Sequence, residues 1–534
     1  MPDRFDQPDG DFRRRVGCFV LHFCVFVCGL LLANQDASAE LSLARPFGDH
    51  MVVQSEVELP VWGKASAEQL VEVQFGEKTQ TTTADRDGRW QVTFPARSAS
   101  SRPTELEVTS AGATLIIRDI LVGEVWLCAG QSNMEWPVSS SASVNEALAS
   151  ADRPNVRLLN YRGAARGGSG RYTGPLLKKL TVEAFCEGQW KVCSAESAGP
   201  FSAVGYYFGV ELHRQLRVPI GLINVSIGGT PTEAWVRREA MAAHPQLEAL
   251  VQGNWLQNSQ LGEWCRERAA YNFAVASKSG ETIPGDDLGP NHSFKPGFMW
   301  KAAVAPLVPF PIRGVVWYQG ESNAQLDWRV RQHEAIFELL ISDWRRQFGQ
   351  GDLPFLYVQL PGMEREFWPE LREQQRRLLK RLPNLGMAVT IDLGHPTNVH
   401  PISKQPVGER LARWALAKTY QRKEVVASGP LLHSMQIEGR QISLGFDFRG
   451  RGLQTRDGLP LRHFEIAGTD GVFYPAVARL RGGRVVASSE LVAEPQHVRY
   501  AWKPFPNPPV NFFNRDDLPA SPFTTEVLTK ESRQ

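Results

Sequence analysis

Between about residue 119 and residue 424, apolar segments typical of buried β-strands alternate with amphipathic segments typical of helices. Nearly continuous apolar character, expected of strands that are covered on both faces, is found in EVWLCAG, PIGLINVSIGG, IRGVVWYQGESN, LPFLYVQLP and GMAVTIDLG. The helical period is found between and after these strands, in residues 201–216, 328–348, 366–382 and 404–420. This alternation predicts an α/β fold with a parallel sheet and helices on both of its faces.

Short predicted strands separated by turns precede and follow this region. Residues 40–118 alternate apolar and polar residues without any helical stretch, which predicts a small N-terminal β-sandwich. Residues 425–534 return to short strands and predict a C-terminal β module. Residues 238–300 mix helical pieces with a polar Gly/Pro segment, and we expect them to form an insertion in the α/β domain of residues 119–424 that could cover its site.

The N-terminus has the layout of a secretory signal peptide over residues 1–39. Arg13-Arg14-Arg15 precedes the apolar run Val16–Ala33, and Ala37-Ser38-Ala39 has a small-x-small cleavage pattern. The alternative is an uncleaved membrane anchor, for which the apolar run is near the lower length limit. We therefore expect an exported protein, periplasmic or extracellular, with no stable membrane span after cleavage.

Charge and cysteine content exclude several classes of protein. The formal net charge of +2 predicts no strong attraction to nucleic acid or to an anionic membrane. Four cysteines remain after residue 39, namely Cys128, Cys186, Cys193 and Cys265, too few for a disulfide scaffold in a chain of 534 residues. Cys186 and Cys193 could pair, and the spacings fit no common zinc pattern.

Small polar clusters follow several of the predicted strands. They are Gly130-Gln131-Ser132-Asn133, Gly228-Gly229-Thr230, Gly320-Glu321-Ser322-Asn323, and Asp392 with His400-Pro401. In an open α/β sheet the carboxyl ends of the strands meet at one crevice, where ligands bind. The clusters therefore predict one shared site.

These clusters contain the groups that acyl transfer requires. Ser132 can supply a nucleophilic hydroxyl and His400 can supply the base. The backbone N–H groups of Ser132 and of Gly229, or of Gly228, can donate to an oxyanion, and the side-chain amide of Asn323 can add a third donor. Glycine suits this position because a side chain would block the substrate's approach to the N–H group.

The order of these motifs resembles that of the SGNH-hydrolase superfamily, and more narrowly the sialate O-acetylesterase family and related bacterial carbohydrate acetylesterases. The blocks that carry the resemblance are CAGQSNMEWPV, GLINVSIGGTPTEAW, VVWYQGESNA, DWRRQFGQGDLPFLYVQL, GMAVTIDLG, VHPISKQPVGERLA, HFEIAGTDGVFYPA and LPASPFTTE. The resemblance covers nearly all of the chain after residue 39. It implies an SGNH-type, flavodoxin-like sheet and a carboxylic ester hydrolase.

The resemblance also implies roles for individual residues. Ser132 would be the nucleophile and His400 the base, with Ser132, Gly229 and Asn323 forming the oxyanion hole and no metal or organic cofactor. The reaction would remove O-acetyl groups from carbohydrate, most directly from sialic acid or a similar sugar, through an acetyl-enzyme intermediate. Two alternatives stay open, an acetylxylan esterase and a carbohydrate-binding relative without catalysis.

The sequence departs from the family pattern beside the base. Related sequences often have an acidic residue two or three positions before the histidine, where this chain has Thr397 and Asn398. Asn398 can orient an imidazole but cannot stabilise an imidazolium by charge. The site is therefore expected to work as a Ser–His dyad or to use another carboxylate to orient His400. Glu321 is the first candidate for that carboxylate and Asp392 the second. A weakened or inactive relative is the remaining alternative.

The same cluster contains side chains of the kinds that bind metal ions. Asp392, His395 and His400 could suggest ligands, but their spacing matches no recognised metal-binding pattern. We therefore expect no metal.

Overall fold

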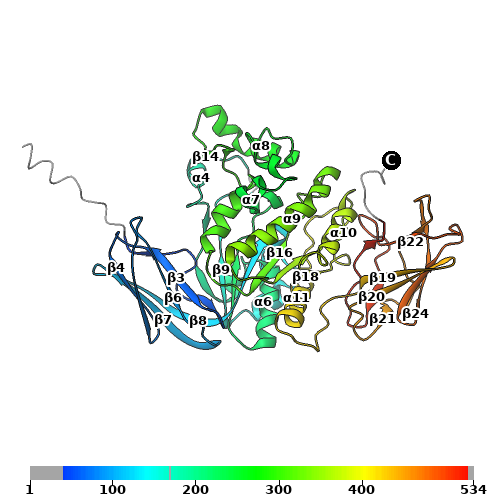
Figure 1. The fold of residues 1–534 in the computed structure, drawn as a ribbon, viewed down its shortest axis with the longest axis horizontal. Helices are drawn as coiled ribbons and strands as arrows, with labels where there is room; N and C mark the ends of the chain where they lie inside the picture. The colour runs from blue at the N-terminus through cyan, green and yellow to red at the C-terminus, as the bar shows by residue number, and fades with distance from the viewer. Residues whose placement is uncertain (1–39, 167–169, 527–534) are drawn as a thin grey trace, which may run out of the picture.

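The computed structural model describes residues 40–166 and 170–526. A β-rich region, a central α/β region and a second β-rich region lie in a row along the long axis (Figure 1). The expected signal peptide, residues 1–39, lies outside the described residues. No helix of the described residues is long and apolar enough to cross a membrane.

The central region is built on the strand order β12-β9-β13-β8-β16-β17-β18. The strands are β8 Ala113–Gly130, β9 Arg153–Asn160, β12 Trp190–Cys193, β13 Ile220–Asn224, β16 Gly314–Tyr318, β17 Phe355–Val358 and β18 Leu385–Ala388. All neighbours pair in parallel except the edge strand β12, which is antiparallel to β9. Without β9 and β12 the order is that of a flavodoxin-like sheet, which confirms the predicted fold class.

Helices cover both faces of this sheet. The larger ones are α6 Ala203–Leu216, α9 Asp327–Phe348, α10 Trp368–Leu378 and α11 Gln405–Trp414, and short ones are α2 Ser132–Glu135, α3 Val144–Ala149 and α5 Ala195–Ala198. The short helix α4 Gly174–Lys178 lies beside the segment 238–300 instead (Figure 1). Trp126 packs edge-on against Phe208 of α6, whereas Trp317 packs on Phe337 of α9. Trp317 of β16 pairs with Ala129 of β8, so the side chains of these two residues lie on the same face of the sheet. Trp126 lies three positions before Ala129 in β8, and side chains alternate between faces along a strand. Trp126 and Trp317 therefore lie on opposite faces.

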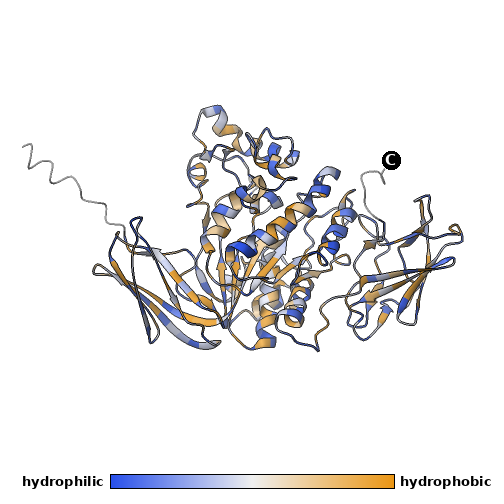
Figure 2. Cartoon of the chain, in the orientation of Figure 1, coloured by the Kyte–Doolittle hydropathy of each residue, from blue (hydrophilic) through white to orange (hydrophobic). Residues whose placement is uncertain are grey.

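Hydropathy follows these layers. The strands β13, β16, β17 and β18 are buried at every residue. Figure 2 shows mostly apolar central strands, whereas α9 and α10 alternate apolar and polar residues. The continuous apolar runs of the sequence therefore mark strands that lie between two helical layers.

The N-terminal β region shares a strand with the central sheet. Its strands are β1 Ser42–Leu43, β2 Val52–Gln54, β3 Leu59–Lys64, β4 Leu70–Phe75, β5 Lys78–Thr83, β6 Arg89–Phe94 and β7 Ser100–Ser110. The first part of β8 pairs with β7, and residues 124–130 of the same strand pair with β13 and β16. The expected boundary at residues 118 and 119 thus falls inside one strand, and a division into domains there stays a prediction.

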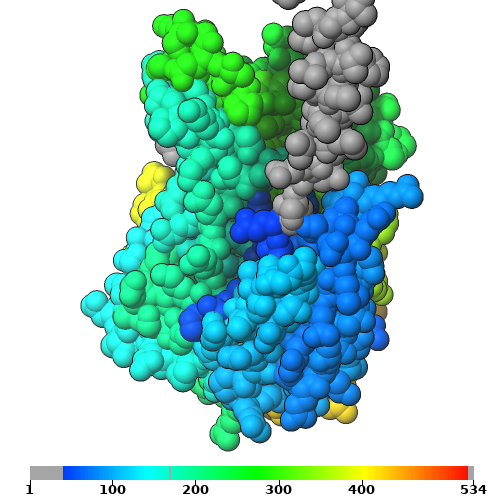
Figure 3. Space-filling view, turned by 90° about the vertical axis from the view of Figure 1, so that its left-hand side faces the viewer, coloured from blue at the N-terminus to red at the C-terminus, as the bar shows by residue number. Residues whose placement is uncertain are grey.

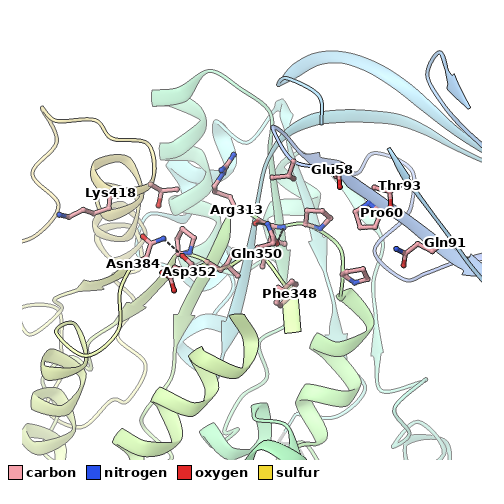
Figure 4. A pocket seen from close by; sticks show the side chains of 17 residues that line it. Glu58, Pro60, Gln91, Thr93, Arg313, Phe348, Gln350, Asp352, Asn384 and Lys418 are labelled. Carbon is pink, nitrogen blue, oxygen red and sulfur yellow. Dashed lines mark hydrogen bonds between the residues drawn. The ribbon is translucent and has the colours of Figure 1, made fainter. Parts of the chain in front are cut away.

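The N-terminal region lies directly against the α/β region, as the blue and cyan surfaces in Figure 3 show. Between the two regions is a cavity of about 650 Å³, lined by Pro60 and Thr93 on one side and by Arg313, Pro354 and Asn384 on the other (Figure 4). Arg313, Pro354 and Asn384 each precede a strand of the central sheet. This cavity therefore lies at the amino ends of the strands, at the opposite edge from Ser132.

The segment 238–300 stands above the carboxyl ends of the strands (Figure 1). It contains α7 Arg238–Ala242, η3 Glu248–Val251, α8 Glu263–Ser279, β14 Gly285–Asp286, β15 Gly289–Pro290 and the start of η4 Trp300–Val304. Trp264 of α8 and Phe294 approach Gly229 closely. The segment therefore contributes side chains beside one of the predicted oxyanion donors.

The C-terminal region contains two four-stranded sheets and a strand pair. They are β19-β20-β25-β24, β23-β22-β26-β28 and β21-β27. The bounds are β19 Leu431–Glu438, β20 Gln441–Asp447, β21 Leu453–Thr455, β22 Phe464–Ala467, β23 Phe473–Pro475, β24 Val477–Arg481, β25 Arg484–Ser488, β26 His497–Tyr500, β27 Phe512–Asn514 and β28 Phe523–Thr524. Hydrogen bonds from Arg372 of α10 to the carbonyl oxygens of Lys503 and Pro504 join this region to the central one.

The four described cysteines are all buried free thiols. The expectation that Cys186 and Cys193 could pair is therefore wrong. Cys186 lies in β11 (Cys186–Glu187), which pairs with β10 (Arg162–Gly163), whereas Cys193 ends β12, which pairs with β9. Burial raises the pKa of both thiols to about 12, so they are poor nucleophiles at neutral pH.

Candidate active site

Ser132 begins the short helix α2 directly after β8. The strand ends at Gly130, which has φ +137° and pairs with Tyr318 of β16. A Cβ atom at Gly130 would lie 2.2 Å from the carbonyl oxygen of Tyr318, so only glycine allows this close approach. The tight turn places Ser132 at the carboxyl edge of the sheet.

His400 lies in the loop between β18 and α11, and its ring meets Ser132. The Nε2 atom of His400 lies 2.8 Å from the Oγ atom of Ser132. The ring of Trp136 stacks on the imidazole, with 5.2 Å between ring centroids and 27° between planes. The structure thus brings the predicted nucleophile and base within hydrogen-bond distance.

The surroundings of His400 favour the neutral imidazole. Burial lowers the pKa of His400 below its usual 6.5, and the positive charges of Lys404 and Arg365 lower this pKa further. A neutral imidazole can accept the proton of a hydroxyl group. The ring therefore stays available as a base at a lower pH than an exposed histidine would.

The three residues expected to orient His400 do not contact its ring. Glu321 accepts a hydrogen bond from Asn133, and Asp392 forms two hydrogen bonds of 2.7 Å with Arg410. The Oδ1 atom of Asn398 accepts a hydrogen bond from the backbone N–H of His400. Within the described part of the chain, Nδ1 of His400 has no hydrogen-bond partner. Of the two expected arrangements, the geometry is that of the Ser–His dyad and not that of a borrowed carboxylate.

The structure also separates the two candidate glycines. The backbone N–H of Gly228 donates to Glu135 Oε2 over 2.7 Å and is thereby occupied. The backbone N–H groups of Ser132 and Gly229 have no hydrogen-bond partner among the described residues, and both residues line the same cavity. Gly229 is therefore available as a donor to an oxyanion, whereas Gly228 is not.

Asn323 is not among the residues that line the cavity, and its role as a third donor stays a prediction. Its side chain is fully buried, and its Nδ2 atom donates to Glu233 Oε2 over 3.1 Å. Its Oδ1 atom accepts from the backbone N–H of Thr232 and from Gln319 Nε2. Asn323 thus joins the loop after β16 to the loop after Gly229, and these hydrogen bonds satisfy its buried amide.

Gln131, which the sequence analysis did not single out, lines the cavity instead. Its Oε1 atom accepts hydrogen bonds from Gln319 Nε2 and from the backbone N–H of Ser322. These two bonds hold the amide oxygen, and the Nε2 atom has no partner among the described residues. Gln131 therefore has an unused donor beside Ser132.

A buried ion pair supports the loop that carries Gly229. Arg329 of α9 donates to Glu233 Oε1 over 2.5 Å, and both side chains are 1% exposed. Glu233 belongs to η2 (Thr232–Trp235), which follows Gly229 along the chain. The pair ties this loop to the helical layer.

The cavity in front of Ser132 and His400 has a volume of about 560 Å³. Trp264 and Phe367 provide apolar walls, and Arg365 also lines the cavity. Within the described residues Arg365 has no carboxylate partner, although its guanidinium lies 5.4 Å from the centroid of the Trp368 ring. A positively charged, unpaired side chain therefore borders the space where a substrate would bind.

The described residues contain no group of three or more His, Cys, Asp or Glu side chains placed to hold a metal ion. The cavity itself presents hydroxyl, imidazole and N–H groups. These are the groups that acyl transfer uses.

Comparison with known proteins finds relatives among the carbohydrate esterases. A family model described as a sialic acid-specific acetylesterase of the carbohydrate esterases matches residues 297–417. The crystal structure of a carbohydrate acetylesterase from Xanthomonas citri superposes with a TM-score of 0.74, at 34% sequence identity over 91% of this chain and 99% of that one.

The chain belongs to the sialate O-acetylesterase family of carbohydrate esterases.

Curated relatives extend this result. The chain is 28% identical to human sialate O-acetylesterase over 448 residues, which cover 76% of each protein. It is 27% identical to the rat sialate O-acetylesterase over 550 residues, or 92% of this chain and 96% of that protein. The esterase is thus a carboxylic ester hydrolase, as the motifs predicted.

Lys404 is a second feature of this esterase that the sequence analysis did not single out. It is 1% exposed, immediately precedes α11, and donates to Asn133 Oδ1. Its place in the block VHPISKQPVGERLA, four residues after His400, was the available signal. Sequence spacing alone does not show that such a lysine is buried, because lysine is almost always exposed.

Proposed function

We propose that this esterase is an exported serine hydrolase that removes O-acetyl groups from carbohydrate through an acetyl-enzyme intermediate. The observation that carries the proposal is the 2.8 Å distance between Ser132 Oγ and His400 Nε2 at the wall of a cavity. The N–H donors of Ser132 and Gly229 in the same wall suit the charge that develops during acyl transfer.

In the first half of the reaction, His400 Nε2 accepts the proton of Ser132 while Oγ attacks the acetyl carbonyl carbon. The resulting oxyanion accepts hydrogen bonds from the backbone N–H groups of Ser132 and Gly229, with Gln131 Nε2 as the proposed third donor. The carbon–oxygen bond to the sugar then breaks, and the sugar oxygen takes the proton from His400. The acetyl group stays on Ser132.

In the second half, His400 accepts a proton from a water molecule that attacks the acetyl carbon. The tetrahedral intermediate collapses, Ser132 Oγ leaves and regains its proton from His400, and acetate is released. Because Nδ1 of His400 has no carboxylate partner in the described chain, we expect this dyad to stabilise its imidazolium less than a triad does.

We propose an acetylated acidic sugar, sialic acid or a similar one, as the substrate. The unpaired guanidinium of Arg365 at the cavity fits a sugar carboxylate, which arginine binds with two parallel hydrogen bonds. The curated relatives are named sialate O-acetylesterases, which agrees with this choice.

An acetylxylan esterase is the second candidate. Trp264 and Phe367 are compatible with it, because aromatic walls can stack on sugar faces whether or not the sugar is charged. Acetate release from O-acetylated sialic acid and from acetylated xylan decides between the two. Arg365→Gln should reduce kcat/KM for acetylated sialic acid selectively; a preference of the native enzyme for xylan would reject the acidic substrate.

The serine mechanism is tested with Ser132→Ala and a chromogenic acetate ester. We expect hydrolysis to be abolished while circular dichroism and thermal unfolding stay unchanged, and a fluorophosphonate to label Ser132 in the native protein. Unchanged hydrolysis by the variant would reject the mechanism. Sugar binding without labelling or turnover would instead support a carbohydrate-binding relative.

Export is proposed from residues 1–39 alone. The N-terminal sequence of protein recovered outside the inner membrane should begin at or near Glu40. Recovery of the full-length chain in the membrane fraction would support the uncleaved anchor.

A further inference from the structure

We propose that Lys404, Asn133 and Glu321 form a buried network that positions His400 against Ser132, in place of a carboxylate bonded to the imidazole. This inference rests on the proposed function, because it assigns these side chains to the support of His400 as the base. All three are positioning residues, since none of them contacts the reacting hydroxyl group of Ser132.

The centre of the network is the side-chain amide of Asn133, which is fully buried. Its Oδ1 atom accepts a hydrogen bond from Lys404 Nζ, and its Nδ2 atom donates to Glu321 Oε1. The same Nδ2 atom donates to the carbonyl oxygen of Val399 over 2.9 Å. Because Val399 directly precedes His400, the amide holds the backbone of the loop that carries the imidazole.

Lys404 is connected to His400 by a second route through Trp136. The Nζ atom lies 5.8 Å from the centroid of the Trp136 ring and 5.4 Å from that of Tyr318. Trp136 also stacks on the imidazole of His400. The ammonium group thus attracts the aromatic ring against which His400 rests.

Stability alone does not account for a lysine at this position. A buried ammonium group costs free energy unless it is paired and hydrogen-bonded, and apolar residues of similar volume often replace buried ion pairs without loss of stability. Lys404 is 1% exposed, and Glu321 Oε2 has no hydrogen-bond partner among the described residues. Such an incompletely satisfied network beside Ser132 and His400 points to a functional role.

Electrostatics connects the network to the base. The positive charges that lower the pKa of His400 belong to Lys404 and Arg365. The carboxyl group that interacts with the charge of Lys404 is that of Glu321. Burial raises the pKa of Glu321, and the hydrogen bond from Asn133 and the charge of Lys404 offset only part of this rise. Burial lowers the pKa of Lys404 to about 7. Removal of the Lys404 charge should therefore raise the pKa of His400.

The first test replaces Lys404 by Met, which is similar in length and has no charge. We expect kcat to fall by about 10- to 100-fold with little change in KM, because the base is misplaced while the substrate contacts remain. The acidic limb of the kcat/KM profile should move to higher pH. Lys418→Met removes a lysine beyond the end of α11, distant from Ser132, and should leave both quantities unchanged.

Glu321→Gln provides a second variant if Lys404→Met does not fold. Gln keeps the shape and the acceptor that faces Asn133 Nδ2, but it removes the charge that raises the pKa of Lys404. The acidic limb should again move to higher pH, and kcat should fall.

A readout without turnover separates this inference from the proposed function. Modification of His400 by diethyl pyrocarbonate, followed against pH by mass spectrometry, reports the pKa of the imidazole in the resting protein. A higher pH midpoint for His400 modification in Lys404→Met and Glu321→Gln would support the network. If fluorophosphonate then failed to label Ser132, the proposed function would be rejected and the network would still stand. Folded variants with the native kcat and the native midpoint would overturn the network.

Discussion

The Oγ atom of Ser132 and the Nε2 atom of His400 lie 2.8 Å apart although 268 positions separate them along the chain. One follows β8 in the middle of the parallel sheet and the other lies beyond β18 at its edge. Their meeting at the carboxyl edge is what a flavodoxin-like sheet produces, because the loops after all of its strands open on the same side.

His400→Ala removes the proposed base and should lower kcat for a chromogenic acetate ester by at least about 10³-fold. The expected loss follows from the absence of any other group hydrogen-bonded to the Ser132 hydroxyl in the described chain. His433→Ala, which removes an exposed histidine paired with Asp447 in β20, serves as the control and should retain native activity. Equal activities of the two variants would contradict the role of His400.

The pH profile of the native enzyme should have an acidic limb below 6.5, because burial and the charges of Lys404 and Arg365 lower the pKa of His400 from that value. As the pH falls through this lowered pKa, the imidazole takes up a proton and can no longer act as a base, so kcat/KM falls. Steady-state rates across the acidic range measure the midpoint. A midpoint above 6.5 would be inconsistent with the observed surroundings of the ring.

Gly229→Ala should impair both stability and catalysis. Gly229 has φ +79°, and a Cβ atom there would lie 2.7 Å from Phe294 Cζ. Gly253→Ala is the matched control, since Gly253 has φ +63° and an added Cβ would have no neighbour within 4 Å. Both variants carry the left-handed backbone cost of about 1–2 kcal/mol. Alanine keeps the backbone N–H group, but the shift that relieves the contact with Phe294 should move this N–H away from the oxyanion. Only Gly229→Ala should therefore also lose kcat, by up to the roughly 10²- to 10³-fold that loss of one oxyanion donor costs.

Thermal unfolding and ester hydrolysis of the two alanine variants give these quantities. Similar unfolding temperatures and equal kcat values for both would contradict the prediction that a side chain at Gly229 strains the loop and displaces its N–H group.

Arg329→Met should destabilise the esterase by about 3–5 kcal/mol, because it leaves the buried charge of Glu233 without its partner. Both side chains are 1% exposed. Arg331→Met, on the same helix, breaks a partly exposed pair with Asp327 and should cost no more than about 1 kcal/mol. Thermal unfolding measures the stability of both variants. The double variant Arg329→Met/Glu233→Gln should recover part of the lost stability, because it removes the unpaired charge. An Arg329→Met protein as stable as Arg331→Met would refute the prediction.

Local pattern was sufficient for the parallel sheet and for the clusters that meet at its edge. Continuous apolar runs specify strands buried on both faces, and the helical period specifies the covering layers, because each pattern depends only on residues close in sequence. The β8 strand shows the limit of this reasoning. It runs from the N-terminal β region into the central sheet, and the apolar pattern of residues 113–130 did not reveal that it pairs with two different regions.

The sequence by itself determined the fold class and the positions of Ser132, Gly229 and His400 at the ends of strands. Only the tertiary structure decided which partner each polar group has: Glu321 is bound to Asn133, Asp392 to Arg410 and Asn323 to Glu233. The reason is physical, because a carboxylate or amide pairs with whichever partner burial brings within about 3 Å. That distance depends on strand register and helix packing between segments hundreds of residues apart, which no local spacing encodes.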